Sequence, residues 1–141
     1  MAGGAESTEP EGPPRVRVVI ADDDRHFRRG LKAVLETDPR VEVVGDAADG
    51  VAVVEVAERV QPDVVLLDVR MPGSGGVDAV AAVRQAVPNV AILMLTVSDE
   101  RVDMAEALRA GAIGYLLKDR TLHEVADAVC SAGRGEPWGL G

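Results

Sequence analysis

The apolar stretch from Val64 to Leu67, followed by the carboxylate of Asp68, constrains the fold of this chain more than any other feature. Four consecutive large apolar residues, two of them β-branched, are typical of a strand buried on both faces, as in a parallel sheet covered by helices. Met71-Pro72 ends such a strand, because proline has no N–H group to donate to a neighbouring strand. We therefore expect Asp68 at the C-terminal end of a central strand, which is where open α/β sheets bind their ligands.

Three more apolar stretches end at polar side chains in the same way. They run from Val16 to Asp23, from Val90 to Thr96 and from Ala112 to Lys118. In a parallel sheet the carboxyl ends of the strands lie along one edge, so the polar groups at these ends should converge. The predicted cluster comprises Asp22, Asp23, Asp68, Thr96 and Lys118.

Strand patterns and helix patterns alternate five times along the chain. Short connections between such units favour right-handed crossovers, and helices then cover both faces of the sheet. The sequence therefore predicts an α/β fold, a doubly wound five-stranded parallel sheet with five helices.

The last two predicted helices differ in their apolar faces. The helix that ends near Ala110 has a weak face, because charged residues surround Val102, Ala105 and Leu108. Helices that pack poorly are candidates for movement. The last helix has a clearer buried stripe, made of Leu122, Val125, Ala126 and Val129.

Length and composition limit the classes of function. The 141 residues suffice for one domain, and 24 acidic against 15 basic residues give a formal net charge of −9. This excess of acids argues against a nucleic-acid-binding surface, which needs a stripe of Lys and Arg. A single cysteine, Cys130, favours the cytoplasm, and no stretch resembles a membrane span or a signal peptide. We expect a disordered tail at residues 1–14, a folded domain at 15–134 and the start of an interdomain linker at 135–141.

The predicted cluster has the chemistry of a metal and phosphoryl site. Two carboxylates about 4 Å apart repel each other by on the order of 4 kcal/mol at an effective dielectric constant of roughly 20. One lysine cannot neutralise three carboxylates, so the set favours a hard divalent cation with oxygen ligands, and Mg²⁺ fits best. Beside a cation and an ammonium group, Asp68 could attack a phosphoryl group while Thr96 donates a hydrogen bond to it. Taken singly, each residue also suits a turn, a helix cap or a surface position, and only their convergence favours a site.

The motifs, taken together, resemble those of a response-regulator receiver domain, the phosphoacceptor half of two-component signalling. The resemblance covers about residues 15–134, the whole of the predicted domain. It implies a flavodoxin-like sheet with the strand order 2-1-3-4-5. The motifs that carry it are Ile20-Ala-Asp-Asp23, Leu67-Asp-Val-Arg-Met-Pro72, Leu95-Thr96 and Gly114-Tyr-Leu-Leu-Lys118.

The resemblance implies an acceptor and a metal site. Asp68 would be phosphorylated by a partner sensor histidine kinase or by a small phosphodonor. The Mg²⁺ ligands would be Asp23, Asp68 and the backbone carbonyl of Arg70, with Asp22 acting mainly through a water molecule. Self-phosphorylation and autodephosphorylation are implied, and no other enzymatic activity.

The resemblance also implies a switch. Thr96 and Lys118 would contact the phosphoryl group, and Tyr115 would swing inward when the threonine moves toward the phosphate. A half-buried strand tyrosine without that role is the alternative. The output face would consist of the fourth helix, the fifth strand and the fifth helix. A homodimer through the fourth and fifth helices is a hypothesis that rests on the weak apolar face described above.

One departure from many receivers indicates a subgroup. Asp119 follows Lys118 where many receivers have proline, as in receivers similar to NarL and FixJ. Members of that subgroup usually carry a C-terminal LuxR-type helix-turn-helix, and these 141 residues contain none. Because residues 133–139 resemble the start of an interdomain linker, we expect a receiver cut from a transcriptional regulator, which would contact DNA only through the missing domain.

Two other hypotheses stay open. The chain could be a complete single-domain receiver that signals through protein contacts. It could also be a phosphohydrolase similar to haloacid dehalogenases, with Asp68 as nucleophile, although Arg70 stands where such enzymes have a second acid. A dinucleotide-binding fold is excluded, because no Gly-x-Gly-x-x-Gly follows the first strand.

Overall fold

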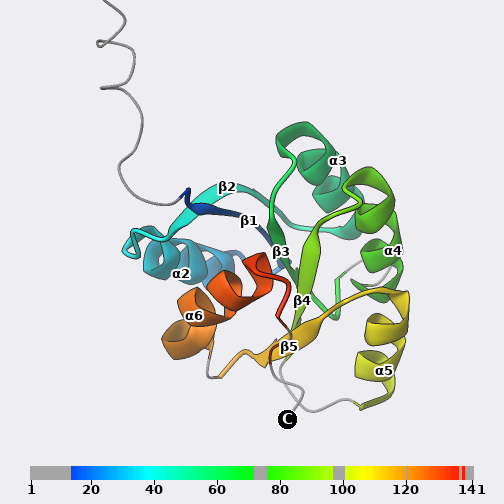
Figure 1. Cartoon of the computed structure of the whole chain (residues 1–141). Helices are drawn as coiled ribbons and strands as arrows, with labels where there is room; N and C mark the ends of the chain where they lie inside the picture. Colours follow the sequence, from blue (N-terminus) through cyan, green and yellow to red (C-terminus); the bar gives the residue numbers. More distant parts are fainter. Residues whose placement is uncertain (1–13, 72–75, 97–100, 120, 137, 139–141) are drawn as a thin grey trace, which may run out of the picture.

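The computed structural model describes residues 14–71, 76–96, 101–119, 121–136 and 138, and it describes residues 76, 77, 101–104, 121 and 123 by their backbone alone (Figure 1). Nearly all of the predicted tail at residues 1–14 and part of the predicted linker at 135–141 lie outside the described residues.

Ten elements alternate along the chain, each strand followed by a helix (Figure 1). They are β1 (Val16–Ala21), α2 (Arg25–Glu36), β2 (Val41–Ala47), α3 (Gly50–Val60), β3 (Val64–Asp68), α4 (Gly76–Ala86), β4 (Ala91–Thr96), α5 (Arg101–Ala110), β5 (Gly114–Leu117) and α6 (Thr121–Gly133).

The five strands form one parallel sheet in the order β2-β1-β3-β4-β5. Helices α2 and α6 lie on one face of the sheet, and α3, α4 and α5 lie on the other (Figure 1). The predicted doubly wound fold and its strand order are therefore confirmed.

The central strand shows why the sheet needs helices on both faces. Val65 and Leu67 belong to the apolar core beneath α3, α4 and α5, whereas Val64 and Leu66 belong to the core beneath α2 and α6. All four side chains are fully buried. Because successive residues of a strand point to opposite faces, a continuous apolar run fills both cores at once.

The apolar faces of the last two helices differ from the sequence prediction. Among the side chains of α5 that the structure describes, Ala107 is fully buried, whereas the predicted Leu108 is 36% exposed. The predicted Ala105 is half-buried, and Val102 lies outside the described side chains. Leu122, expected in the stripe of α6, is 49% exposed, because it lies in the first turn, and the buried stripe runs through Val125, Ala128, Val129 and Ala132.

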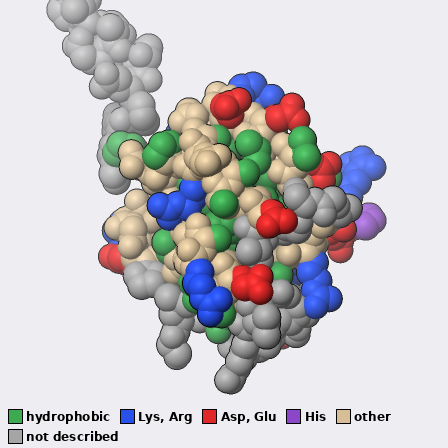
Figure 2. Space-filling view, turned by 90° about the vertical axis from the view of Figure 1, so that its right-hand side faces the viewer, with side chains coloured by type: hydrophobic (Ala, Val, Ile, Leu, Met, Phe, Trp, Pro, Cys, Tyr) green, Lys and Arg blue, Asp and Glu red, His purple; other side chains and the backbone are tan. Residues whose placement is uncertain are grey.

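The surface of the molecule on the side of α4 and α5 carries acidic and basic side chains interspersed with each other (Figure 2). The side chains drawn in colour on this face form no continuous basic stripe. None of the helices in the described part of the chain is long and apolar enough to cross a membrane.

Candidate metal and phosphoryl site

The carboxyl edge of the sheet brings the predicted residues together. Asp68 is the last residue of β3 and Thr96 the last of β4, while Asp22 and Lys118 directly follow β1 and β5. Backbone hydrogen bonds extend beyond the strands at this edge: the Asp22 N–H donates to the Ala47 carbonyl (3.0 Å) and the Lys118 N–H donates to the Thr96 carbonyl (2.7 Å). The positions of the functional side chains are therefore fixed by the sheet itself.

Three carboxylates form the acidic cluster of the site, namely Asp22, Asp23 and Asp68. One oxygen from each lies within 4.8 Å of the others. Asp22 is fully buried and Asp68 is 5% exposed, whereas Asp23 is exposed. The cluster thus opens to solvent on the side of Asp23, from which a cation can enter.

The third aspartate of the Asp-Asp-Asp sequence is not part of this cluster. Asp24 is the N-cap of α2, and its side chain accepts hydrogen bonds from the N–H groups of His26 (3.0 Å) and Phe27 (3.1 Å). The hydrogen bond from Phe27 is the main reason why the pKa of Asp24 lies below its ordinary value. Capping by Asp24 fixes the start of α2 and leaves Asp22 and Asp23 to face the site.

Lys118 joins the two buried carboxylates. Its Nζ atom lies 2.6 Å from Oδ2 of Asp22 and 3.3 Å from Oδ2 of Asp68. Burial by itself would lower the pKa of Lys118, but its contacts with Asp22 and Asp68 outweigh burial and raise the pKa. The lysine is therefore a permanent cation, and it also lies 4.8 Å from the ring centroid of Phe27, a cation–π contact.

The pKa of Asp68 is raised from 3.8 to about 6. Burial is the largest cause, and the charge of Asp22 adds to it. The hydrogen bond from the Arg70 N–H to Oδ1 of Asp68 (3.1 Å) and the charge of Lys118 act in the opposite direction. One ammonium group thus falls short of what the buried carboxylates require, as the sequence predicted.

Asp22 has acceptor capacity that a cation could use. Its Oδ1 atom accepts a hydrogen bond from the Asp24 N–H (2.8 Å). Its Oδ2 atom is buried and contacts the Lys118 ammonium, but it accepts no well-aligned hydrogen bond from the residues that the structure describes. A buried carboxylate oxygen with spare acceptor capacity, beside two more carboxylates, is the donor set that a hard divalent cation takes.

The other predicted site residues surround this cluster. Thr96 is 3% exposed at the end of β4, next to the strand that carries Asp68. Arg70 is exposed, and its backbone adjoins the Asp68 carboxylate through the 3.1 Å hydrogen bond. Tyr115 is half-buried in β5 and packs against the core on the side of α3, α4 and α5.

Sequence reasoning missed two residues of the site, both in α2. Arg28 donates through its guanidinium to the backbone carbonyl of Asp22 (2.6 Å), and its Nε atom lies 3.3 Å from Oδ2 of Asp46. The ring of Phe27 lies beneath the Lys118 ammonium. The capping signal of Asp24 could have identified both, since it places the first turns of α2 against the Asp22-Asp23 loop.

The opposite end of the sheet contains a cavity of about 520 Å³. Its lining includes Asp63, Val90 and Ile113, which precede β3, β4 and β5. Because these residues lie at the amino ends of the strands, the cavity is separate from the acidic cluster.

This fold and this site define a receiver domain. The family model described as "Response regulator receiver domain" matches residues 18–130, and the chain belongs to that family. Its relatives are response regulators similar to NarL, as the residue after Lys118 led us to expect.

Two curated relatives show the extent of the similarity. The uncharacterized transcriptional regulatory protein YxjL of Bacillus subtilis is 40% identical over 122 residues, which cover 86% of this chain and 56% of that protein. The nitrate/nitrite response regulator protein NarP of Escherichia coli is 40% identical over 126 residues, which cover 89% of this chain and 58% of NarP. The chain therefore spans little more than half the length of these relatives.

A solved structure shows the same fold. The signal receiver domain of NarL from Mycobacterium tuberculosis superposes with a TM-score of 0.83 at 42% sequence identity. The match covers 88% of this chain and 100% of that receiver domain.

Proposed function

We propose that Asp68 is the phosphoacceptor of a two-component phosphorelay. The observation that carries the proposal is a nearly buried carboxylate at the end of the central strand, 3.3 Å from an ammonium group and beside two further carboxylates. A carboxylate oxygen of Asp68 attacks the phosphorus of a phosphohistidine or a small phosphodonor. The bond from phosphorus to the donor breaks, and an acyl phosphate forms on Asp68.

The metal in this proposal is Mg²⁺, held by Asp23, Asp68 and the backbone carbonyl of Arg70, with Asp22 contributing through water. When bound, Mg²⁺ neutralises negative charge on the oxygens of the transferring group. The spare acceptor of Asp22 and the exposure of Asp23 support this site. Lys118 stabilises the same oxygens through its charge, and Thr96 donates a hydrogen bond to one of them.

The partner that supplies the phosphoryl group is a sensor histidine kinase, and the proposed compartment is the cytoplasm. Self-phosphorylation and autodephosphorylation are the only reactions proposed for the chain. Membership of the receiver family, whose members are in general not enzymes, supports this part.

The output face in this proposal consists of the fourth helix (α5), the fifth strand (β5) and the fifth helix (α6), with Tyr115 as the switch. Leu108 and Leu122, two exposed apolar side chains of α5 and α6, support a homodimer through this face. A C-terminal LuxR-type domain outside these 141 residues would bind DNA. Its proposed connection is the linker that begins at residue 135, after a receiver domain at 15–134 and a tail at 1–14.

Intact mass spectrometry tests the acceptor directly. After incubation with acetyl phosphate and Mg²⁺, we expect one added phosphoryl group on the wild type and none on Asp68→Asn. Asp78→Asn, which alters an exposed carboxylate in the first turn of α4, is the matched control and should be phosphorylated like the wild type. Phosphorylation of a folded Asp68→Asn variant to the wild-type extent would contradict the assignment.

A further inference from the structure

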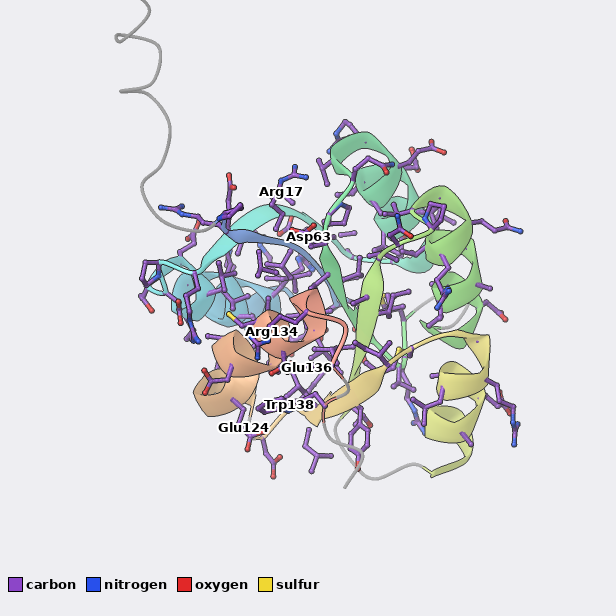
Figure 3. All side chains as sticks on the ribbon, in the orientation of Figure 1. Arg17, Asp63, Glu124, Arg134, Glu136 and Trp138 are labelled. Atoms are coloured by element: carbon purple, nitrogen blue, oxygen red, sulfur yellow. The ribbon has the colours of Figure 1, made fainter. Side chains whose placement is uncertain are left out.

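The segment that follows α6 lies against the edge of the sheet at β5. Trp138 forms a parallel bridge with Gly114, and the Tyr115 N–H donates to the Trp138 carbonyl (3.0 Å). Figure 3 shows Trp138 beside β5, with Arg134 and Glu136 between the end of α6 and this contact. One residue of a continuing chain thus pairs with the strand that is otherwise the outermost of the sheet.

A tight turn after α6 directs the chain toward β5. The N–H of Gly135 donates to the Ala132 carbonyl (2.8 Å), and the N–H of Glu136 donates to the Ser131 carbonyl (3.0 Å). Gly135 has a φ of +78°, in the left-handed region that favours glycine. An ion pair between Arg134 and Glu136 (3.1 Å) spans the turn. These contacts set the direction in which the chain leaves α6.

Gly114 is the residue of β5 that permits this contact. A Cβ atom at this position would collide with the carbonyl oxygen of Trp138 and would lie 2.8 Å from its backbone nitrogen. The φ of Gly114 is not in the left-handed region, so glycine is required here for space and not for backbone conformation. The side chain of Trp138 is half-buried and packs against the core beneath α2 and α6.

We propose that the edge of β5 is a docking surface for the chain at Trp138, with Gly114 as the residue that admits it. The occupant is already in place, held by the backbone hydrogen bond to Tyr115 and by the packing of Trp138. Strand edges bind extended segments in this manner, with the main chain providing affinity and side chains providing selectivity.

The docking also couples this segment to the phosphoacceptor site. This coupling rests on the proposed function. Tyr115, whose amide is the donor, is the proposed switch residue, and its strand continues into Lys118 at the acidic cluster. The hydrogen bond to Trp138 is made by the backbone of Tyr115, so a shift of the β5 backbone on phosphorylation would change the position of Trp138. By linkage, removal of the Trp138 contact would then change the affinity of the site for a phosphoryl analogue.

Trp138 is the only tryptophan of the chain, so its fluorescence reports the docked segment directly. In Gly114→Ala we expect the emission to shift to the red and the Tyr115 amide to exchange its hydrogen about tenfold faster, because one backbone hydrogen bond is lost. Gly30→Ala, where an added Cβ meets nothing within 4 Å, is the matched control and should change neither signal. Wild-type emission and exchange in Gly114→Ala would overturn the docking.

A second variant tests whether the segment is docked on β5 if Gly114→Ala does not fold. Trp138→Ala lies beyond α6 and removes the side chain that packs against the core. The Tyr115 amide should again exchange faster than in the wild type, here because the carbonyl of residue 138 is no longer held. A folded Trp138→Ala protein with wild-type exchange at Tyr115 would overturn the docking.

Titration with beryllofluoride and Mg²⁺, followed by ¹⁹F NMR, tests the coupling. We expect the affinity of Trp138→Ala to differ from that of the wild type by about fivefold or more. Equal affinities would overturn the coupling and leave the phosphoacceptor function intact. If the wild type binds no beryllofluoride, the proposed function fails and the coupling fails with it, whereas the docking is decided by exchange and fluorescence alone.

Discussion

The Nζ atom of Lys118 lies closer to Oδ2 of Asp22, at 2.6 Å, than to Oδ2 of Asp68, at 3.3 Å. Asp22 is the fully buried carboxylate of the cluster, so the ammonium compensates the negative charge with the least access to water. A cation bound among the carboxylates would add to this compensation, which Lys118 alone provides among the residues that the structure describes.

Removal of Lys118 should therefore destabilise the protein in a manner that Mg²⁺ corrects. We expect Lys118→Met to lower the free energy of unfolding by about 3 kcal/mol in the presence of a chelator, because Asp22 loses its counter-charge. Urea unfolding with and without Mg²⁺ measures the effect, and Mg²⁺ should stabilise the variant more than the wild type. Lys32→Met, an exposed position on α2, is the matched control. A variant as stable as the wild type in chelator would contradict the assignment of Lys118 as the counter-charge of Asp22.

Two adjacent aspartates should respond differently to the same substitution. Asp23→Asn removes a charge from the acidic cluster and should weaken Mg²⁺ binding by about tenfold, since affinity follows the number of charged ligands. Asp24→Asn should bind Mg²⁺ like the wild type and keep its stability, because asparagine caps helices as well as aspartate does. Calorimetric titration with Mg²⁺ compares the two. Equal losses of affinity would mean that only the local charge matters and that Asp23 is not a ligand.

The fold and the five residues at the carboxyl edge could be predicted because both depend on where apolar runs end. The continuous run from Val64 to Leu67 fits a strand covered on both faces, and the register of a parallel sheet then places Asp68 beside the ends of the neighbouring strands. The ends of β1, β4 and β5 can be located in the sequence without any information about side-chain conformation. The convergence of Asp22, Thr96 and Lys118 with Asp68 follows from chain direction alone.

Contacts that depend on how elements turn and approach each other could not be predicted. The apolar pattern of α5 does not fix which of Ala107 and Leu108 faces the core, because the choice depends on the neighbouring helix. The reach of Arg28 to the carbonyl of Asp22 depends on one side-chain conformation. The pairing of Trp138 with Gly114 joins residues far apart in the sequence through a single bridge, which leaves no periodic pattern to read.

The raised pKa of Asp68 predicts a pH dependence of stability. Between pH 3.8 and about 6 the carboxyl group is protonated in the folded protein and ionised in the unfolded chain. The stabilisation from this proton is fully present below pH 3.8 and is lost as the pH rises through about 6. The loss amounts to at most about 3 kcal/mol for a shift of roughly two pKa units.

Comparison with Asp68→Asn focuses on this effect, because titrating groups that do not interact with Asp68 contribute equally to both proteins. In chelator, the variant should gain stability relative to the wild type between pH 4 and pH 7.5, as measured by urea unfolding. Addition of Mg²⁺ at pH 7.5 should stabilise the wild type and leave the variant almost unchanged. The same stability difference at both pH values would show that burial of Asp68 does not hold its proton.

Arg28 should act as a positioning residue for the acidic cluster. Its guanidinium donates to the carbonyl of Asp22 at 2.6 Å and lies beside Asp46, so it holds the loop that carries Asp22 and Asp23. We expect Arg28→Met to lower the free energy of unfolding by about 2 kcal/mol, the contribution of a charge-assisted hydrogen bond. It should also weaken Mg²⁺ binding several-fold in calorimetric titration, although Arg28 itself touches no metal.

Two further variants separate positioning from general stabilisation. Arg29→Met removes the adjacent, exposed arginine and controls for the loss of one positive charge. Arg28→Lys keeps the charge but offers a single ammonium group, which cannot reproduce the two-sided contact of the guanidinium. If the loop is held by that contact, the Mg²⁺ affinity of Arg28→Lys falls between those of the wild type and Arg28→Met. A destabilised Arg28→Met protein that binds Mg²⁺ with wild-type affinity would instead assign Arg28 to the stability of α2 alone.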